Sequence, residues 1–358
     1  MFKLGHKLSL SYLSAMRSIG TVGVIVLAIT GCTSAVEEEP FSACDFDRKV
    51  TEHQVIGFYP GYKHDVLPIS QIRWDMLTRV IYAFAIPETD GSINVADLSR
   101  LDSLVQAAHA NGVEVYVSVG GGAGSSNYPV FATNEGARGN FVRTVRQYLA
   151  ENCLDGVDID WEEWNKDDAN IPIASEKVAF MSLMKELRSE LDSWGISLDV
   201  YPGDWFGRHY DEVYHLVDYV HVMGYDFSGP WSAPGPHSSF DQAIGTGSDV
   251  SATGLAYWVN YRKWPSGKII LGLPFYGRDF DVNGGRGVAY RDIAARYPNA
   301  PGMDRVENIY YNGRQTIADK TQYVVENGLP GVMIWEIAHD THDPVTSLLQ
   351  VINDTISQ

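Results

Sequence analysis

Eight short apolar runs follow one another between residues 54 and 335, and they restrict the possible folds more than any other feature. They occupy residues 54–59, 79–86, 113–119, 155–160, 196–201, 219–225, 268–273 and 331–335. Most are continuous and rich in Val, Ile and Tyr, as is typical of parallel strands covered on both faces. The stretches between them have helical spacing, as in residues 98–108 before Gly112. Eight strand-helix units in about 300 residues predict an α/β fold, the (β/α)8 TIM barrel.

The first 31 residues have the pattern of a targeting segment, with basic residues before a short apolar run at 21–29. The run ends in Cys32 and resembles a bacterial lipobox. That resemblance implies cleavage before Cys32 and a lipid on its sulfur, so that 1–31 is a signal peptide, 32–52 a lipidated tether and 53–358 the folded domain. Thr33 in place of Asp favours the outer membrane as the destination. An ordinary secretory signal with a coincidental cysteine is the alternative.

The chain is strongly acidic, which argues against a nucleic acid as its partner. The formal net charge is −18, and removal of three basic residues and no acids with 1–31 makes it −21. Lipidation of Cys32 leaves Cys44 and Cys153, which an export compartment would allow to pair, although two free thiols are also compatible with the sequence. No CxxC or His-rich ligand pattern indicates zinc.

The fourth run carries three acids at alternate positions, Asp158, Asp160 and Glu162. Side chains at i, i+2 and i+4 of a strand share one face, at spacings of roughly 6–7 Å. Three buried carboxylates repel one another, so at least one should have a raised pKa, as a general acid requires. The alternative is an acidic edge strand that faces water.

Chemistry in a barrel of this kind gathers at the C-terminal ends of the strands. The residues there are acids and aromatics without a cationic cluster, which is typical of a sugar site because aromatic rings stack on pyranose rings. They occur in the runs Ser118-Val119-Gly120-Gly121-Gly122, Met223-Gly224-Tyr225-Asp226, Pro274-Phe275-Tyr276-Gly277-Arg278 and Trp335-Glu336, with Glu162 at the fourth strand.

From about residue 55 to 340 the chain resembles glycoside hydrolase family 18, the chitinase family. Residues 155–162 match the family's DGxDxDxE signature in full, 118–121 match SxGG, and 223–226 match MxYD, in the expected order. The first motif is highly specific, and the other two are informative in combination with it.

The resemblance implies a retaining, substrate-assisted reaction that needs neither metal nor cofactor. Glu162 would protonate the leaving oxygen and then act as base, while the substrate's own 2-acetamido oxygen attacks and closes an oxazolinium ring. Asp160 would accept the acetamide N–H, and Asp158 would share its proton. Tyr225 would hold the acetamido group. The other expected substrate-binding residues are Asp226, Met223, Trp335, Tyr276, Ser118, Gly120, Gly121, Phe84 and Trp231, with Trp335 as the floor of the site and Trp164 and Trp205 as further candidate stacking platforms.

Three departures from the family pattern are informative. Phe58 follows Gly57 where many members have a Tyr that supports the inner Asp, so Tyr59 or Ser118 is expected to replace it. Gly122 stands where a Trp often lies on the leaving-group side. Residues 275–330 already hold two predicted helices, near 289–297 and 316–327, so the α+β insertion between strands 7 and 8 should be reduced or absent. A shallow groove and internal cleavage of the polymer follow from that.

The expected function is a monomeric chitinase that acts on β-1,4-linked N-acetylglucosamine, held by lipid in the bacterial envelope. Three alternatives remain open. An endo-β-N-acetylglucosaminidase commonly departs from the MxYD motif, a peptidoglycan-directed hydrolase would have the same catalytic residues, and a chitin-binding lectin has usually lost the glutamate at the position of Glu162.

Overall fold

The computed structural model describes residues 44–167, 173–203, 210–246, 253–282 and 284–358. The chain divides into two compact units, 1–40 and 41–358, and the first lies wholly outside the described residues. Cys32 and Trp205, for which the sequence predicts roles, also lie outside them. No helix among the described residues is long and apolar enough to cross a membrane.

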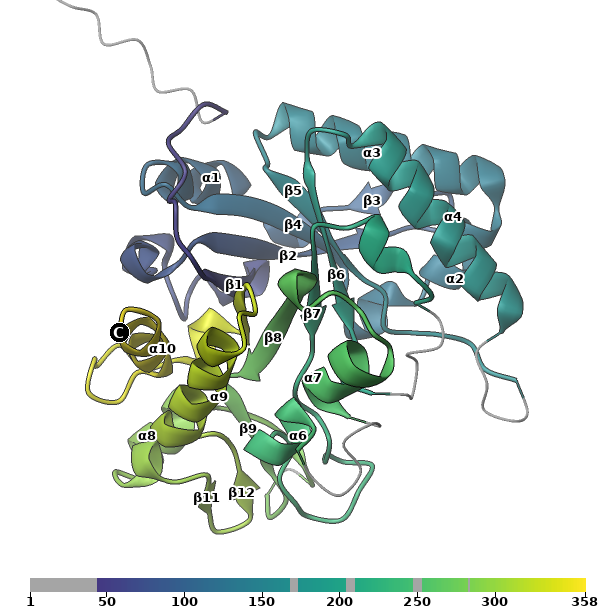
Figure 1. Ribbon diagram of the computed structural model, residues 1–358. Coiled ribbons are helices and arrows are strands. Elements are labelled where there is room, and N and C mark those ends of the chain that lie inside the picture. Colours follow the sequence, from purple (N-terminus) through teal and green to yellow (C-terminus); the bar gives the residue numbers. More distant parts are fainter. Residues whose placement is uncertain (1–43, 168–172, 204–209, 247–252, 283) are drawn as a thin grey trace, which may run out of the picture. The chain divides into compact units, whose positions relative to one another are not determined.

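The predicted barrel is confirmed, because eight parallel strands form a closed sheet in chain order (Figure 1). The first strand pairs with both the second and the last, which closes the barrel. A ninth, two-residue strand, β3 (Ile93–Asn94), pairs antiparallel with the end of the second. The barrel strands are β1 (Gln54–Pro60), β2 (Arg79–Pro87), β4 (Glu114–Gly120), β5 (Gly156–Asp160), β6 (Gly195–Val200), β7 (Tyr219–Val222), β8 (Ile269–Pro274) and β13 (Gly331–Trp335).

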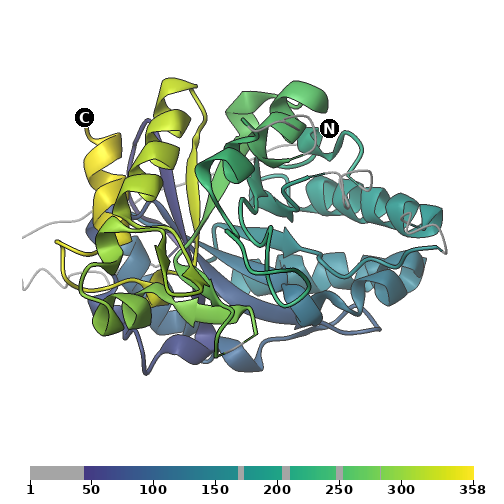
Figure 2. The same cartoon turned by 90° about the horizontal axis from the view of Figure 1, so that it is seen from below.

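Helices cover the outside of the barrel, as Figures 1 and 2 show from two directions. Their apolar stripes pack on the outward-facing strand residues, and α4 buries Phe180, Leu183 and Leu187 in this way. Asn134 caps α3 by accepting the Ala137 N–H. The helices are α1 (Leu101–His109), α2 (Tyr128–Thr133), α3 (Glu135–Glu151), α4 (Ala174–Glu190), α6 (Phe240–Ile244), α7 (Gly254–Ala256), α8 (Tyr290–Arg296), α9 (Arg314–Glu326) and α10 (Leu348–Ile356).

Strand residues alternate between this outer core and a second cluster inside the barrel, because successive side chains of a strand point to opposite faces. Phe58, Ile81 and Met333 belong to the inner cluster, and their neighbours Val80 and Val332 belong to the outer one. Arg79, two residues before Ile81 on β2, also points into the barrel. It is 4% exposed, and its guanidinium lies over the ring of Tyr116. Arg79 Nη2 pairs with Glu114 at 2.6 Å, so the buried cation is neutralised.

The insertion between the seventh and eighth barrel strands is reduced, and its complete absence, the other possibility left by the sequence, is excluded. It consists of α8 and a four-stranded antiparallel sheet in the order β10-β9-β12-β11. The strands are β9 (Tyr276–Asp279), β10 (Arg286–Ala289), β11 (Arg305–Val306) and β12 (Ile309–Tyr310). The two predicted helices of this region correspond to α8 and α9. Because β9 starts shortly after β8 ends, the small sheet is continuous with the rim of the barrel.

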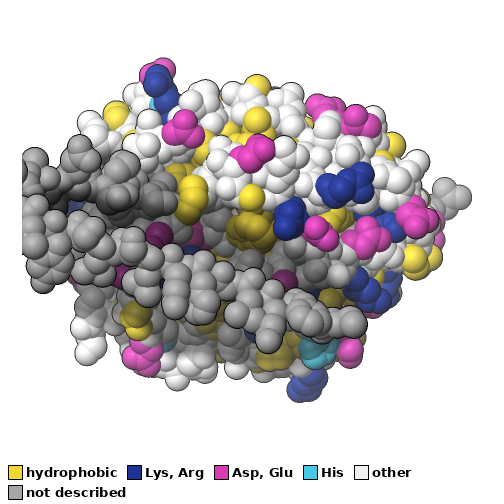
Figure 3. All heavy atoms as spheres, turned by 90° about the horizontal axis from the view of Figure 1, so that it is seen from above, with side chains coloured by type: hydrophobic (Ala, Val, Ile, Leu, Met, Phe, Trp, Pro, Cys, Tyr) yellow, Lys and Arg dark blue, Asp and Glu magenta, His cyan; other side chains and the backbone are white. Residues whose placement is uncertain are grey.

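Residues 44–49 contact the segments that lead into β2, β4 and β5, at the N-terminal ends of the barrel strands. Cys44 forms a disulfide with Cys153, which answers the pairing question that the sequence left open. Phe46 stacks on His109 with ring centroids 3.8 Å apart, and Arg48 Nη2 pairs with Asp155 Oδ1 at 2.7 Å. The described segment therefore begins with residues fixed to the domain. Figure 3 shows acidic and basic side chains interspersed over the described part of one face.

Candidate active site

A cavity of about 950 Å³ opens at the C-terminal ends of the barrel strands. Its size is that of a site for an extended small ligand. Ten of the expected site residues line it, while Asp158, Ser118 and Gly120 lie in the strands directly beneath, so the expected residues form one site. The ten are Phe84, Gly121, Asp160, Glu162, Met223, Tyr225, Asp226, Trp231, Tyr276 and Trp335.

Asp158 is the innermost acid of β5 and is completely buried. Its Oδ2 accepts a hydrogen bond from Ser118 Oγ at 2.9 Å, and its Oδ1 accepts one from Ser197 Oγ at 2.6 Å. Burial alone would raise the pKa of this carboxyl, but contacts with His221, Ser197 and Ser118 outweigh burial and lower it. Asp158 is therefore held in the ionised form.

Asp160 lies two residues further along β5, toward the cavity. Its pKa is shifted in the opposite direction to that of Asp158. It is 4% exposed, and its Oδ1 has no hydrogen-bond partner within the described chain. Burial, together with the charges of Glu162, Asp199 and Asp158, raises its pKa well above the ordinary value. Asp160 therefore holds a proton more strongly than Asp158 does, and its Oδ1 is available to a ligand.

Glu162 follows the end of β5 and reaches the cavity. Its backbone N–H donates to Ser125 Oγ at 3.0 Å, and its carbonyl accepts from the Tyr201 hydroxyl at 3.0 Å. Burial raises the pKa of the carboxyl, and the charge of Asp226 adds to the effect, although the Gly122 N–H that donates to Oε1 opposes it. A fixed carboxylic acid with a raised pKa at a cavity has the property that a general acid needs.

The glycines after β4 allow the backbone to pass close to these acids. Gly120 has φ +110°, and a Cβ there would lie 2.2 Å from the carbonyl oxygen of Asp160. Gly121 has φ +73°, and a Cβ there would lie 2.5 Å from the ring of Phe84. Only glycine fits both positions. The Gly122 N–H reaches Glu162 as a result of this close approach.

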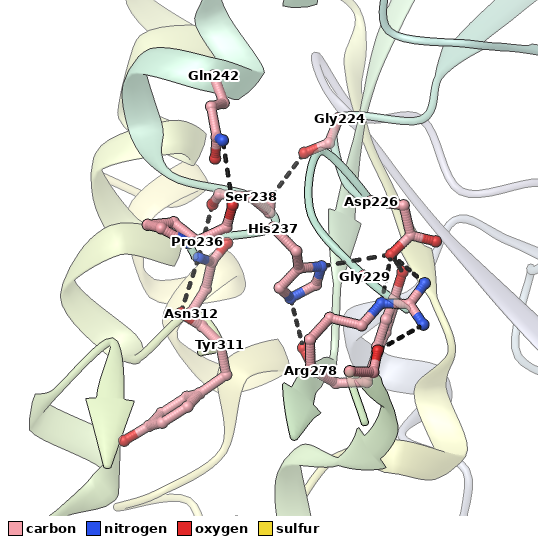
Figure 4. Close-up of polar contacts among 12 residues, drawn as sticks. Gly224, Asp226, Gly229, Pro236, His237, Ser238, Gln242, Arg278, Tyr311 and Asn312 are labelled. Atoms are coloured by element: carbon pink, nitrogen blue, oxygen red, sulfur yellow. Dashed lines mark hydrogen bonds and ion pairs between the residues drawn. The ribbon is translucent and has the colours of Figure 1, made fainter. Parts of the chain in front are cut away.

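The loop after β7 places Tyr225 and Asp226 at the cavity. Figure 4 shows Asp226 facing Arg278 and His237. Asp226, at φ +64°, accepts on Oδ1 from the Tyr276 hydroxyl at 2.7 Å and from Arg278 Nε at 2.9 Å. His237 Nδ1 lies 3.5 Å from the same oxygen, and its Nε2 faces the Tyr276 carbonyl at 3.1 Å. Burial opposes ionisation of Asp226, but His237 and Arg278 outweigh burial and lower its pKa. Asp226 is thus a fixed anion.

A buried lysine supports this loop from behind. The Ser238 hydroxyl donates to the Gly224 carbonyl at 2.6 Å, which fixes the turn before Tyr225 (Figure 4). Lys320 Nζ donates to Ser238 O, Ser238 Oγ and Asn312 Oδ1, each at 2.7 Å. Because an ammonium has three N–H donors, all of them are used in the protonated form. The position of Gly224 therefore depends on a side chain of α9.

Comparison with known proteins agrees with this arrangement of acids and loops. The sequence profile of "Glycosyl hydrolases family 18" matches residues 54–340. The chain belongs to this family. A "chitinase-like effector" of Moniliophthora perniciosa is 32% identical over 250 residues, which cover 63% of this chain and 56% of that protein. "Endochitinase 1" of Metarhizium robertsii is 26% identical over 67% of this chain and 65% of that protein. The matched part thus covers less than two thirds of either relative.

Two solved structures of the family resemble the whole domain. A GH18 chitinase from the chitin utilization locus of Flavobacterium johnsoniae has a TM-score of 0.71 and 26% identity, over 86% of this chain and 94% of that one. A chitinase from Bacteroides thetaiotaomicron has a TM-score of 0.74 and 26% identity, over 85% and 96% of the two chains. The family's barrel is therefore complete in this protein.

Some of the aromatic residues expected at the site line the cleft, whereas others belong to the core. Trp335 lines the cavity with its ring 5.6 Å from that of Phe84, and Trp231 is 64% exposed at the cavity, with the Arg278 guanidinium 5.2 Å from its ring centroid. Trp164 is buried and stacks on Trp161 at 4.2 Å, so its candidacy as a sugar platform was wrong. The sequence cannot separate these cases because both tryptophans follow a strand end.

One expected substitution for the missing family tyrosine was also wrong. The Tyr59 hydroxyl bonds to His64 and to the Leu67 carbonyl, and its ring belongs to the outer core, so it does not approach Asp158. Strand alternation gives the reason, since Phe58 occupies the inward position of β1. Ser118, the other candidate, does contact Asp158.

Several residues of the site were not recognised in the sequence, among them Ser197, Asp199 and His221, and Arg278 was placed at a strand end without a role. The signal that could have revealed the first three is the alternation of β6 and β7, because Ser197 and Asp199 share a face, and Asp199 pairs with His221 across the two strands. Polar residues on the inward positions of an otherwise apolar barrel strand point to a functional interior. Arg278 could have been found from its place two residues after Tyr276 on β9.

Proposed function

We propose that this protein is a chitinase that hydrolyses β-1,4 linkages between N-acetylglucosamine residues with retention of configuration. The observation that carries the proposal is the arrangement of three neighbouring acids at the cavity. Asp158 lies beneath it and accepts from Ser118 and Ser197, whereas Asp160 and Glu162 line it, and burial raises the pKa of both. Family relatives named endochitinase and chitinase support the same substrate class.

In this reaction Glu162 donates its proton to the glycosidic oxygen as the bond to C1 breaks. The carbonyl oxygen of the substrate's own acetamido group attacks C1, so that the positive charge passes into an oxazolinium ring. Asp160 accepts the N–H of that ring, and the proton it held at rest is shared with Asp158. Glu162, now ionised, removes a proton from the water that opens the ring.

Tyr225 and Asp226 orient the acetamido group. Tyr225 is 7% exposed and lines the cavity beside Tyr276, with ring centroids 6.1 Å apart. Asp226 is fixed by Tyr276 and Arg278 and cannot rotate without breaking several hydrogen bonds. Trp335 supplies an apolar floor under the reacting sugar, as aromatic rings do for pyranose faces.

The test is hydrolysis of a chromogenic N-acetylglucosamine oligomer by wild type and Glu162→Gln. Turnover should fall by a factor of about 10³ or more while the oligomer still binds, because the amide preserves shape but has no transferable proton. Glu163→Gln is the matched control, since Glu163 is exposed and adjacent and should retain activity. Undiminished turnover in Glu162→Gln would remove this residue from its role. Equal cleavage of a deacetylated oligomer would exclude the acetamide as nucleophile.

We further propose internal cleavage of the polymer, because the insertion that could enclose the cleft is small, a four-stranded sheet with α8. Product analysis on chitin, N-glycans and peptidoglycan side by side separates a chitinase from the related endo-β-N-acetylglucosaminidases and wall hydrolases. Release of disaccharide alone from one chain end would contradict the endo mode. The intact Met223 to Asp226 motif favours chitin over N-glycans.

We also propose that the mature protein is anchored in the bacterial envelope through lipid on Cys32. The support for this is the lipobox-like run that ends at Cys32. In a host that processes lipoproteins, the wild type should partition into detergent and incorporate radiolabelled fatty acid, whereas Cys32→Ser should do neither. Equal partition of both proteins into the aqueous phase would contradict the anchor.

A further inference from the structure

A second polar group lies inside the barrel beneath the catalytic row, the three acids Asp158, Asp160 and Glu162. Asp199 on β6 and His221 on β7 are buried, and Asp199 Oδ1 lies 2.9 Å from His221 Nδ1. The same Nδ1 lies 3.4 Å from Asp158 Oδ1. One imidazole nitrogen therefore faces two carboxyl groups.

Asp199 also reaches the cavity, which it lines together with Asp160 and Glu162. The site thus contains five carboxyl groups: the three of the catalytic row, Asp226 of the loop after β7, and Asp199 of β6. The motif residues have assigned roles in the proposed reaction, and Asp199 has none.

We propose that Asp199 and His221 are positioning residues that hold one proton beside Asp158 and thereby set the pH range over which the catalytic row works. The proposal rests on the proposed chitinase function. It adds to that function a proton-holding pair that the family motifs do not contain.

The geometry requires a proton at this place. His221 Nδ1 offers a single N–H to two carboxyl groups, so it can donate a good hydrogen bond to Asp199 or to Asp158 but not to both. Two ionised carboxylates in a buried site repel each other strongly, and one proton shared among the three groups removes the repulsion. Burial, with the charge of Asp158 and contact with it, raises the pKa of Asp199 well above its ordinary value. Asp199 is thus the acid that keeps a proton while Asp158 is ionised.

Few other charges act on this pair from the surrounding strands. Phe58 of β1 meets the His221 ring edge-on at 6.4 Å, and Ser118 of β4 contacts Asp158. The inward residues Ile270 of β8 and Met333 of β13 are apolar. The remaining titratable groups that the described part of the chain places in the interior are Asp160, Glu162, Tyr201, Tyr225, Asp226 and Tyr276 toward the cavity, and Tyr116, Tyr219 and the Arg79–Glu114 pair at the other end.

The two members of the pair should affect different limbs of the pH profile of kcat/KM. The charges of Asp199 and Glu162 repel each other, so the charge that Asp199 acquires as the pH rises helps to keep the proton on the general acid Glu162. Asp199→Asn removes that charge, so the alkaline limb, where Glu162 loses its proton, should move to lower pH by about one pH unit. His221→Asn removes the contact that helps to lower the pKa of Asp158, so the acid limb should move to higher pH by a similar amount. On the affected limb, each shift is about a tenfold loss at fixed pH.

The experiment measures kcat/KM on the chromogenic oligomer against pH for wild type, both variants and Leu198→Ala. Leu198 is the matched control, because it is buried next to Asp199 but faces the outer core. Leu198→Ala should lower stability without moving either limb. If Asp199→Asn does not accumulate as folded protein, the position of the acid limb in the pH profile of His221→Asn tests the proposal.

Three results would overturn the inference. Unmoved limbs in both variants would show that the pair does not act on the row, and an equal loss at every pH would indicate a structural role. Loss of wild-type activity in a chelator would point instead to a cation among Asp158, Asp199 and His221, whose ligand-type atoms lie within 4.8 Å of one another. A wild type without activity on the oligomer would refute the proposed function itself, which separates the two failures.

Discussion

Replacement of Lys320 by methionine should change how the free energy of unfolding depends on pH, and the structure determines the direction of that change. Lys320 is completely buried and forms no ion pair with the described residues. Among the described residues, its ammonium donates hydrogen bonds to Ser238 and Asn312, which Figure 4 shows in their polar cluster. Burial lowers its pKa from 10.5 to about 7. Lys320→Met keeps the length and apolar stem of the side chain and removes the titration.

The magnitude follows from linkage between proton binding and folding. Between pH 7 and 10.5 the unfolded chain carries a proton on Lys320 that the folded chain has lost. The unfolded state therefore binds more protons, so the free energy of unfolding rises with pH in this window and does not change with the titration of this group below it. A difference of about 3.5 between the two pKa values gives about 5 kcal/mol over the whole window, of which about 2 kcal/mol falls between pH 7 and pH 9.

The assay is urea unfolding of wild type and Lys320→Met at pH 7 and pH 9. Other titrating groups are common to both proteins and cancel in the difference, so the wild type should gain about 2 kcal/mol relative to the variant. Lys185→Met on the exposed face of α4 is the control and should show no such gain. An equal change with pH in wild type and Lys320→Met would refute the reasoning, because it would mean that Lys320 titrates alike in the folded and unfolded chains.

Two further predictions concern the edge of the domain and the cleft. Cys44→Ser removes a disulfide that joins residues 109 apart, so the free energy of unfolding should fall by about 3–5 kcal/mol in oxidising buffer. A reducing agent should abolish the difference from the wild type. Equal urea midpoints of the two proteins under oxidising conditions would contradict this prediction. Trp231→Ala should leave stability within about 0.5 kcal/mol because the ring is 64% exposed, yet raise KM for long oligomers several-fold. The control is Tyr261→Ala, 60% exposed and outside the cavity lining, and an equal KM effect there would remove Trp231 from the site.

The barrel and the order of its site motifs were determined by the sequence because their signals are local. Burial on both faces makes each parallel strand a continuous apolar run. A residue at the C-terminal end of such a strand lies at the active-site face of the barrel, whichever strands are its neighbours. For this reason the runs at 54–59 and 331–335 located the first and last strands, and Glu162 could be placed at the mouth before any contact was known.

The tertiary structure decided what depends on contacts between distant segments. Cys44 meets Cys153 only because the segment before β1 crosses the N-terminal ends of the neighbouring strands. Trp164 belongs to the core because other rings pack on it, whereas Trp231 is left exposed at the cleft. The pairing of Asp199 with His221 follows from the register of β6 and β7. A sequence shows that a side chain alternates inward, but the register between strands decides which inward side chains meet.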